Sequence, residues 1–155
     1  MRKLAVMLLF AVLASPFSGV ALYGPAGGRA AAAAEGAPAA AEGAEIRRVI
    51  EGQLAAFRRD DGEGAFAFAA PNIRTMFGNA ATFLRMVRTG YPPVYRPREV
   101  EFRSLGVEDG RLTQRVLLVG PDGVPVVARY YMEQQPDGSW RIGGCVLEAA
   151  PDVTT

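Results

Sequence analysis

Residues 112–147 decide the fold: LTQRVLLVGPDGVPVVARYYMEQQPDGSWRIGGCVL. Apolar and polar residues alternate along this stretch, and the alternation is interrupted by two Pro-Asp-Gly turns, at 121–123 and 136–138. Pro presets the first turn position and Gly takes the left-handed one, which is typical of β-hairpins. A further run precedes the turn Glu108-Asp109-Gly110. The sequence therefore predicts four antiparallel strands, at residues 99–107, 112–119, 124–134 and 139–147.

The turns also predict how the strands pair. If each Pro-Asp-Gly is a three-residue loop with a bulge, Gly120 faces Val124 and Gln135 faces Ser139. Counting back from the turns pairs Gln114 with Tyr130, Val116 with Ala128, Tyr130 with Gly144 and Met132 with Ile142. Leu118, Val126, Trp140 and Val146 share their face, which is nearly all apolar and is expected to pack on helices. The outer face is predicted to carry Arg115, Leu117, Val119, Val127, Arg129, Tyr131, Glu133, Arg141, Cys145 and Leu147.

Helices are predicted before the strands. Apolar residues recur at helical spacing at Ile46, Val49, Ile50, Leu54 and Phe57. Shorter pieces follow: residues 65–70, then 71–77, opened by Pro71 and closed by Gly78, then 80–89, with Asn79 as N-cap and Gly90 as stop. Helices followed by an antiparallel meander make an α+β arrangement.

The N-terminus has the pattern of a secretory signal peptide. Met1-Arg2-Lys3 is positive, residues 4–13 are uninterruptedly apolar, and small residues follow. We predict a signal peptide at 1–22 with an open cleavage site, a flexible Ala/Gly/Pro-rich tether at 23–44, a folded domain at 45–149 and a tail at 150–155. An uncleaved anchor is the alternative, because residues 4–23 carry no charge. The protein is accordingly expected in the periplasm or secreted.

Composition narrows the function classes. The 155 residues suit a single domain, and 17 Lys plus Arg against 16 Asp plus Glu give a net charge of +1 without a basic cluster. Nucleic acid is therefore not an expected partner, and a membrane is expected only through the signal segment. Without histidine and with one cysteine, no tetrahedral metal site with nitrogen and sulfur ligands can be assembled, and an all-oxygen site stays open. No phosphate loop or cofactor fingerprint occurs, so no cofactor is predicted.

Several short motifs resemble an exported bacterial family that is catalogued as a domain of unknown function. They are Gln53-Leu54-Ala55-Ala56-Phe57 followed by Asp60-Asp61, Met76-Phe77-Gly78, Phe83 with Met86-Val87, Tyr91-Pro92-Pro93-Val94-Tyr95, and Asp137-Gly138-Ser139-Trp140-Arg141-Ile142 with Gly144-Cys145. The resemblance covers Ile46 to Glu148. It implies a cone-shaped roll of the nuclear-transport-factor-two-like, or SnoaL-like and cystatin-like, kind, with helices packed into a curved sheet. That superfamily holds both enzymes and binding modules, so the resemblance carries a fold and leaves the function open.

Two polar side chains are predicted on the inward face, Gln114 and Tyr130. A buried amide or phenol needs a hydrogen-bond partner. They either bond to each other or to backbone groups, or they orient a ligand in a small apolar pocket. The candidate pocket is roofed by Phe57, Phe66 and Phe83 and floored by Trp140 and Gly144.

The outer face is a candidate interface. Arg115 is predicted opposite Arg129, and Leu117 and Tyr131 supply apolar surface. The face is either solvated, a homodimer contact, or a place where the two guanidinium groups hold an anion. Cys145 is placed there too, either buried and inert or available for an intermolecular disulfide.

These features predict a non-catalytic module that binds a small apolar ligand or a protein partner. The alternative is a lyase or isomerase that uses a carboxylate or Tyr130 in the apolar cone. No catalytic residue is assigned, because no Asp or Glu falls on the inward face of the last three strands, and Asp60, Asp61 and Glu63 lie between helices, where acids usually cap or face water.

Overall fold

The computed structural model describes residues 40–151. The predicted signal peptide, residues 23–39 of the predicted tether and the end of the predicted tail lie outside this range. No helix within it combines the length and the apolar character needed to cross a membrane.

The helices follow the predicted order, with two earlier starts and one short additional helix that was not predicted. Their bounds are α1 Ala40–Arg58, α2 Gly62–Ala67, α3 Pro71–Phe77, α4 Ala80–Gly90 and α5 Pro92–Tyr95. The earlier starts are those of α1 and α2, and α5 is the additional helix. The helix α1 begins inside the predicted tether, because alanine is the best helix former and can extend a helix whose later turns are packed. Asn79 caps α4 as predicted, since its side chain accepts a hydrogen bond from the Thr82 amide at 2.8 Å. Asp61 caps α2 in the same way through the Gly64 amide.

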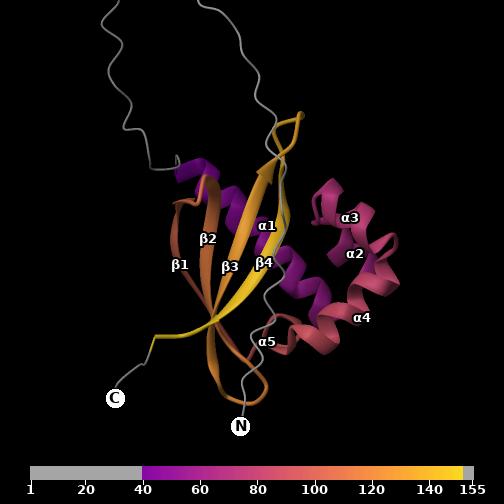
Figure 1. The fold of residues 1–155 in the computed structure, drawn as a ribbon, viewed down its shortest axis with the longest axis vertical. Helices are drawn as coiled ribbons and strands as arrows, with labels where there is room; N and C mark the ends of the chain where they lie inside the picture. Colours follow the sequence, from indigo (N-terminus) through magenta and orange to yellow (C-terminus); the bar gives the residue numbers. More distant parts are fainter. Residues whose placement is uncertain (1–39, 152–155) are drawn as a thin grey trace, which may run out of the picture. The chain divides into compact units, whose positions relative to one another are not determined.

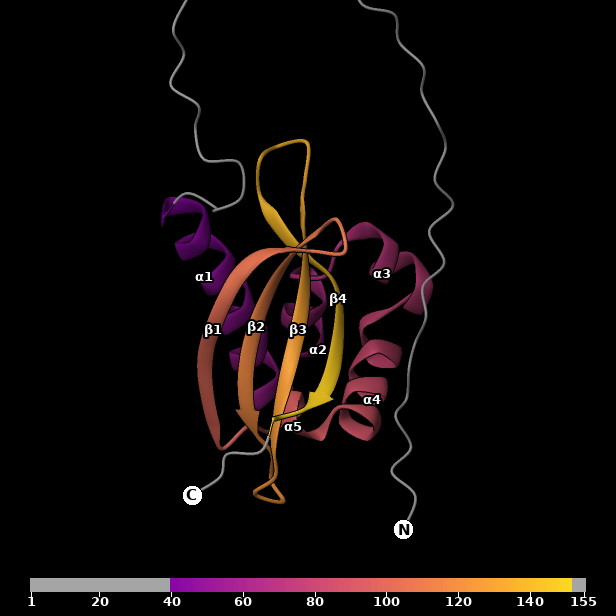
Figure 2. The same cartoon turned by 60° about the vertical axis from the view of Figure 1, so that its left-hand side comes forward.

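The four predicted strands form one antiparallel sheet. They are β1 Glu99–Glu108, β2 Arg111–Val119, β3 Pro125–Gln134 and β4 Trp140–Ala149, in the order β1-β2-β3-β4. Figures 1 and 2 show α1 crossing behind the sheet, with α2, α3 and α4 beside β4. The predicted α+β class is therefore confirmed: helices pack against one face of an open four-stranded sheet.

The predicted register holds up to a bulge in β4. Gln114 pairs with Tyr130, Val116 with Ala128 and Met132 with Ile142, as expected. Tyr130, however, pairs with Cys145 and not with Gly144, because the pairing shifts between Tyr131 and Met132 and leaves Gly143 as an extra residue. One extra residue moves every later side chain to the opposite face.

The bulge corrects four predicted positions. Gly144 pairs with Tyr131 on the outer side and not with Tyr130. Cys145 and Leu147 lie on the helix-facing side, where they pack against the core, and Val146 lies on the outer side opposite Arg129. The prediction that Cys145 belongs to the outer-face interface is therefore wrong. The physical cause of the error is the bulge at Gly143, because counting residues back from the turn assumes a regular strand.

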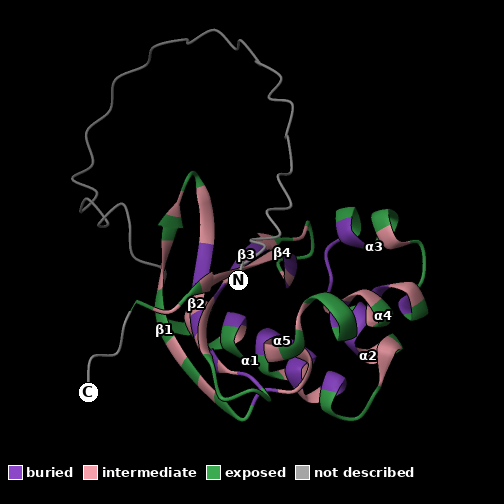
Figure 3. Cartoon of the chain, turned by 60° about the horizontal axis from the view of Figure 1, so that its bottom comes forward, coloured by how far each residue is buried: buried purple, intermediate pink, exposed green. Residues whose placement is uncertain are grey.

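The core lies between the sheet and the helices, as the buried segments in Figure 3 show. Its largest fully buried side chains are Tyr130, Phe57, Ile46, Ile50, Leu118, Val116 and Thr113. All the residues predicted to face inward from α1 are buried.

The chain between α2 and α3 adds a short parallel bridge to the outer edge of β4. The Ala70 amide donates to the Ile142 carbonyl at 2.9 Å, and the Ile142 amide donates to the Phe68 carbonyl at 2.9 Å. This bridge fixes the start of α3 next to Arg141.

Gly52 in the middle of α1 is required by packing. A Cβ at this position would lie 2.5 Å from the Phe68 Cζ atom. We expect Gly52→Ala to lower the free energy of unfolding by about 1–3 kcal/mol, although Gly→Ala in an exposed helix interior normally raises it by about 1 kcal/mol.

Gly43→Ala on the same helix is the matched control for Gly52→Ala, measured by urea denaturation. A Cβ at Gly43 meets only the Leu105 Cδ2 atom, at 3.5 Å, which is ordinary contact. This variant should be neutral or stabilised. Equal stabilisation by both substitutions would contradict the packing of Phe68 on α1.

Candidate functional site

The predicted pocket residues Phe57, Phe66, Phe83 and Trp140 come together in the apolar cluster between the sheet and the helices. The Phe83 ring lies 5.9 Å from the Phe57 ring and 5.3 Å from the Phe66 ring, measured between centroids. All four side chains are buried. Gly144 pairs with Tyr131 and faces the outer side.

Gln114 is held by backbone carbonyl groups. Its Nε2 atom lies 3.0 Å from the Arg103 carbonyl oxygen, 3.2 Å from that of Ser104 and 2.8 Å from that of Arg115. Arg103 and Ser104 form the irregular part of β1, where its pairing with β2 shifts. The amide therefore satisfies strand carbonyls, which is one of the two expectations for this residue.

Tyr130 is fully buried, and its hydroxyl has no hydrogen-bond partner of normal geometry. The Cys145 thiol, brought to this face by the bulge, lies beside it. Burial, followed by the neighbouring thiol, raises the pKa of Tyr130 well above its usual value, so the phenol stays neutral.

The outer face carries an ion-pair network. Arg115 binds Glu108 through two contacts, Nε to Oε1 at 2.7 Å and Nη2 to Oε2 at 3.0 Å. Arg129 lies 3.1 Å from Glu108 and 2.9 Å from Glu148. Arg115 and Arg129 therefore both form ion pairs with carboxylates of the same chain. On the same face, Arg111 lies over the Tyr131 ring. Leu117 follows on β2, where it pairs with Val127.

This network predicts an acid-dependent loss of stability. Hydrogen bonding to Arg115 lowers the pKa of Glu108. A carboxyl whose pKa is lower in the folded state stabilises the fold above its unfolded pKa, and this contribution disappears as the pH falls through the folded pKa. We expect Glu108→Gln to lower the free energy of unfolding by about 1–2 kcal/mol at pH 7, and the difference from wild type to vanish well below pH 4.

Glu101→Gln is the matched control for Glu108→Gln, with urea denaturation at each pH as the measurement. Glu101 pairs with Arg103 on β1, but both side chains are more than half exposed. An exposed pair contributes below about 1 kcal/mol. A pH-independent difference between wild type and Glu108→Gln would contradict the assignment.

A second cluster, which the sequence did not reveal, joins the end of α1 to α5. The Tyr95 hydroxyl donates to Asp60, Arg96 Nη2 lies 2.9 Å from the same carboxylate, and Arg96 Nη1 donates to the Phe57 carbonyl at 2.6 Å. Tyr95, through its hydrogen bond, lowers the pKa of Asp60. The cluster satisfies a carbonyl at the end of α1 and has a structural role.

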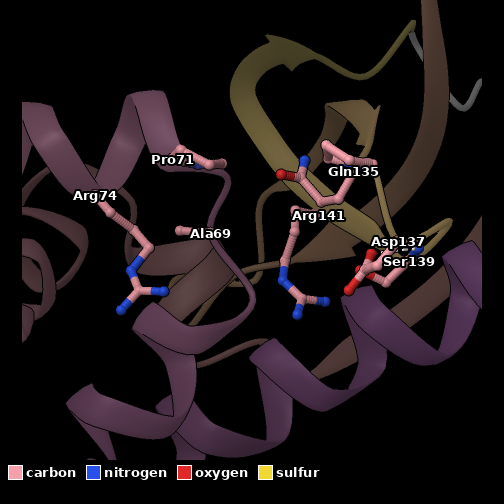
Figure 4. A pocket seen from close by; sticks show the side chains of 8 residues that line it. Ala69, Pro71, Arg74, Gln135, Asp137, Ser139 and Arg141 are labelled. Atoms are coloured by element: carbon pink, nitrogen blue, oxygen red, sulfur yellow. Dashed lines mark hydrogen bonds between the residues drawn. The ribbon is translucent and has the colours of Figure 1, made fainter.

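A surface pocket of about 340 Å³ lies between the start of α3 and the hairpin that joins β3 to β4. The bridge to Ile142 places Ala69 and Pro71 against Arg141. The hairpin forms the opposite wall, closed by the Gln135 amide, which donates to the Ser139 carbonyl at 2.8 Å. The lining residues, drawn in Figure 4, are Ala69, Pro71, Arg74, Gln135, Pro136, Asp137, Ser139 and Arg141.

Charge in this pocket is unbalanced. Arg74 and Arg141 line it, and neither has a carboxylate within 4.0 Å in residues 40–151. Asp137 is the acid of the lining, and its Oδ1 atom accepts hydrogen bonds from the Ser139 amide at 2.9 Å and the Ser139 hydroxyl at 2.6 Å. These bonds lower the pKa of Asp137, so it stays ionised.

Sequence reasoning missed this pocket. It placed Arg141 on the outer face opposite Glu133, which is confirmed, but gave Arg74 no role. The two arginines are far apart in the chain, and only the bridge between Phe68–Ala70 and Ile142 brings them to one place. The local sequence feature of the pocket is the turn Asp137-Gly138-Ser139, and this sequence predicts a hairpin without indicating a binding site.

Comparison with known proteins gives one match. No curated protein and no solved structure is significantly similar to this chain. Residues 39–155 match the family described as Domain of unknown function (DUF4864). The matched range includes every helix and strand described above. The chain belongs to this family.

Proposed function

We propose that the protein is a non-catalytic binding module for a small molecule, and that the ligand binds in the pocket between α3 and the β3–β4 hairpin. One observation carries the proposal: apolar walls from Ala69 and Pro71 and polar groups from three separate segments converge on one 340 Å³ pocket. Small-molecule sites typically combine such walls with a few convergent polar groups in a volume of roughly 300–1,000 Å³.

The chemistry of the pocket favours binding over catalysis. Its hydroxyl, on Ser139, donates to Asp137, but the lowered pKa of that carboxyl makes it a weak base. The chain has no histidine that could replace it. A nucleophile without a base of suitable pKa is not activated at neutral pH.

We also propose that the protein acts after export and has the cone-shaped nuclear-transport-factor-two-like roll. The signal-like pattern of residues 1–22 supports the first proposal, and helices packed on one face of a four-stranded meander support the second. Fractionation of cells that express the full chain tests export: the mature protein should appear in the periplasm or medium with its N-terminal residues removed.

Native mass spectrometry of the protein purified after export tests the binding proposal. We expect a co-purifying small-molecule mass that is absent from Gln135→Trp, which fills the pocket, and present in Gln134→Trp. Gln134 is exposed on the same hairpin and does not line the pocket, so it is the matched control. A bound mass that survives Gln135→Trp would contradict the proposed location.

The same experiment separates the other functions suggested by the sequence. A mass lost in Tyr130→Phe and Gln114→Leu but retained in Gln135→Trp would place the ligand in the apolar core between sheet and helices. A ligand-free dimer would instead move the function to the outer face around Arg115, Leu117, Arg129 and Tyr131, as a protein-interaction module.

A further inference from the structure

We infer that the ligand of this pocket is an anion, held through a carboxylate or phosphate group between the guanidinium groups of Arg74 and Arg141. This inference rests on the proposed function and adds the chemical class of the ligand. It is carried by two cationic side chains, from α3 and from β4, that line the same pocket.

The other arginines near the sheet already have partners. Arg115 and Arg129 bind Glu108, and Arg111 lies 3.8 Å from Glu133. Further arginines without a carboxylate within 4.0 Å in residues 40–151, such as Arg48 and Arg85, are exposed like Arg74 but do not line the pocket. The pocket differs because two guanidinium groups line one concave site, in which Asp137 is the acid that Arg141 attracts from a distance.

Contacts within the protein partly position both side chains. The Arg74 guanidinium lies over the Phe66 ring, 5.4 Å from its centroid. Arg141 Nη1 donates to the Trp140 carbonyl at 3.1 Å. In Figure 4 both side chains extend toward the same side of the pocket, with Ala69 between them. Because a guanidinium has five N–H donors, most remain available to an oxyanion, which they match as planar forks.

The remaining lining residues limit the ligand. Asp137 offsets one of the two positive charges, and its Oδ1 atom is already bonded to Ser139. The net charge of the lining is therefore positive, which favours an acid over a neutral or basic ligand. Ala69, Pro71 and Pro136 provide apolar contact for a compact carbon body. A short dicarboxylate or a small phosphate ester fits these constraints.

Isothermal titration calorimetry of the exported protein at low salt tests whether the pocket binds an anion. The probes are succinate, inorganic phosphate and succinamide, the last being the uncharged equivalent of succinate. We expect succinate or phosphate to bind and succinamide not to bind. Arg74→Gln and Arg141→Gln should each weaken binding about tenfold or more, because charge-assisted hydrogen bonds are lost.

Arg85→Gln is the matched control, since Arg85 is an exposed arginine of α4 that does not line the pocket. It should bind the probes as wild type does, and unfolding midpoints of all three variants should confirm that they fold. Preference for phosphate or for succinate identifies the anionic group. Arg141→Lys should restore only part of the affinity, because an ammonium keeps the charge without the fork.

Three results would overturn the inference: equal binding of succinate and succinamide, anion binding that both Gln variants retain, or no binding of either anion. If the native ligand is nonetheless lost in Gln135→Trp, the binding function stands and only its anionic class fails. If Gln135→Trp also retains the ligand, both proposals fail.

Discussion

An alanine inserted between Gly144 and Cys145 should abolish the folded domain. The extra residue would take the place opposite Tyr130, so the end of β4 could pair with β3 only by turning over, which would move Cys145 and Leu147 to the outer face and Glu148 inward. The core beside Tyr130 would lose its apolar partners and gain a carboxylate. Burying an unpaired charge alone costs several kcal/mol, which approaches the whole stability of a small domain.

Circular dichroism and urea denaturation measure this effect, with Gly143→Ala as the control. The substitution keeps the residue count, and its Cβ would meet the side chain of Glu133, which must change its rotamer to make room. We expect Gly143→Ala to cost about 1 kcal/mol and to unfold cooperatively. A cooperative transition in the insertion variant, at a midpoint near wild type, would contradict the assigned pairing of Cys145 with Tyr130.

Cys145 should react about ten- to a hundredfold more slowly than an ordinary thiol in the native protein. The residue is partly exposed, but burial of the thiol beside Tyr130 raises its pKa from 9.0 to about 12, and the thiolate is the reactive form. At pH 8 the thiolate fraction falls by about three powers of ten with such a shift, and the greater nucleophilicity of the more basic thiolate recovers part of this loss. An intermolecular disulfide through Cys145 is therefore not expected in the folded state.

The measurement is the rate of reaction with a disulfide reagent at pH 8, before and after unfolding in urea. The control is Cys145→Ala combined with Val107→Cys, because Val107 is 63% exposed. The control should react at nearly the same rate in both states, whereas wild type should accelerate strongly on unfolding. A native rate equal to that of the control would contradict the burial of the thiol beside Tyr130.

Local chemistry explains why most of the fold could be predicted. The Pro-Asp-Gly turns, the Asn79 cap and the period-two alternation act within a few residues, so the strands and the first half of the register followed from them. The bulge at Gly143 could not be predicted, because glycines have no side chain that indicates which face of the sheet they belong to. Asn72 of α3 and Glu133 of β3, which lie next to Gly143 only in the folded structure, contact the bulge.

The candidate site was less predictable than the fold. The inward polar residues Gln114 and Tyr130 were correctly paired, but neither the partner of the Gln114 amide, an irregular segment of β1, nor the neighbour of Tyr130 could be read from the chain. The pocket of Arg74 and Arg141 depends on a tertiary bridge, for which no spacing rule exists.

The edge strands β1 and β4 determine whether the sheet can extend from one molecule to the next. Phe68–Ala70 occupies the amide and carbonyl groups of Ile142 at the outer edge of β4. The strand β1 is interrupted where Gln114 takes up the Arg103 and Ser104 carbonyls. Exposed, regular outer strands are templates on which a second molecule can polymerise, whereas occupied or irregular ones are not. The protein should therefore resist fibre formation, and self-association, where it occurs, should use side-chain surfaces instead of continued strand pairing.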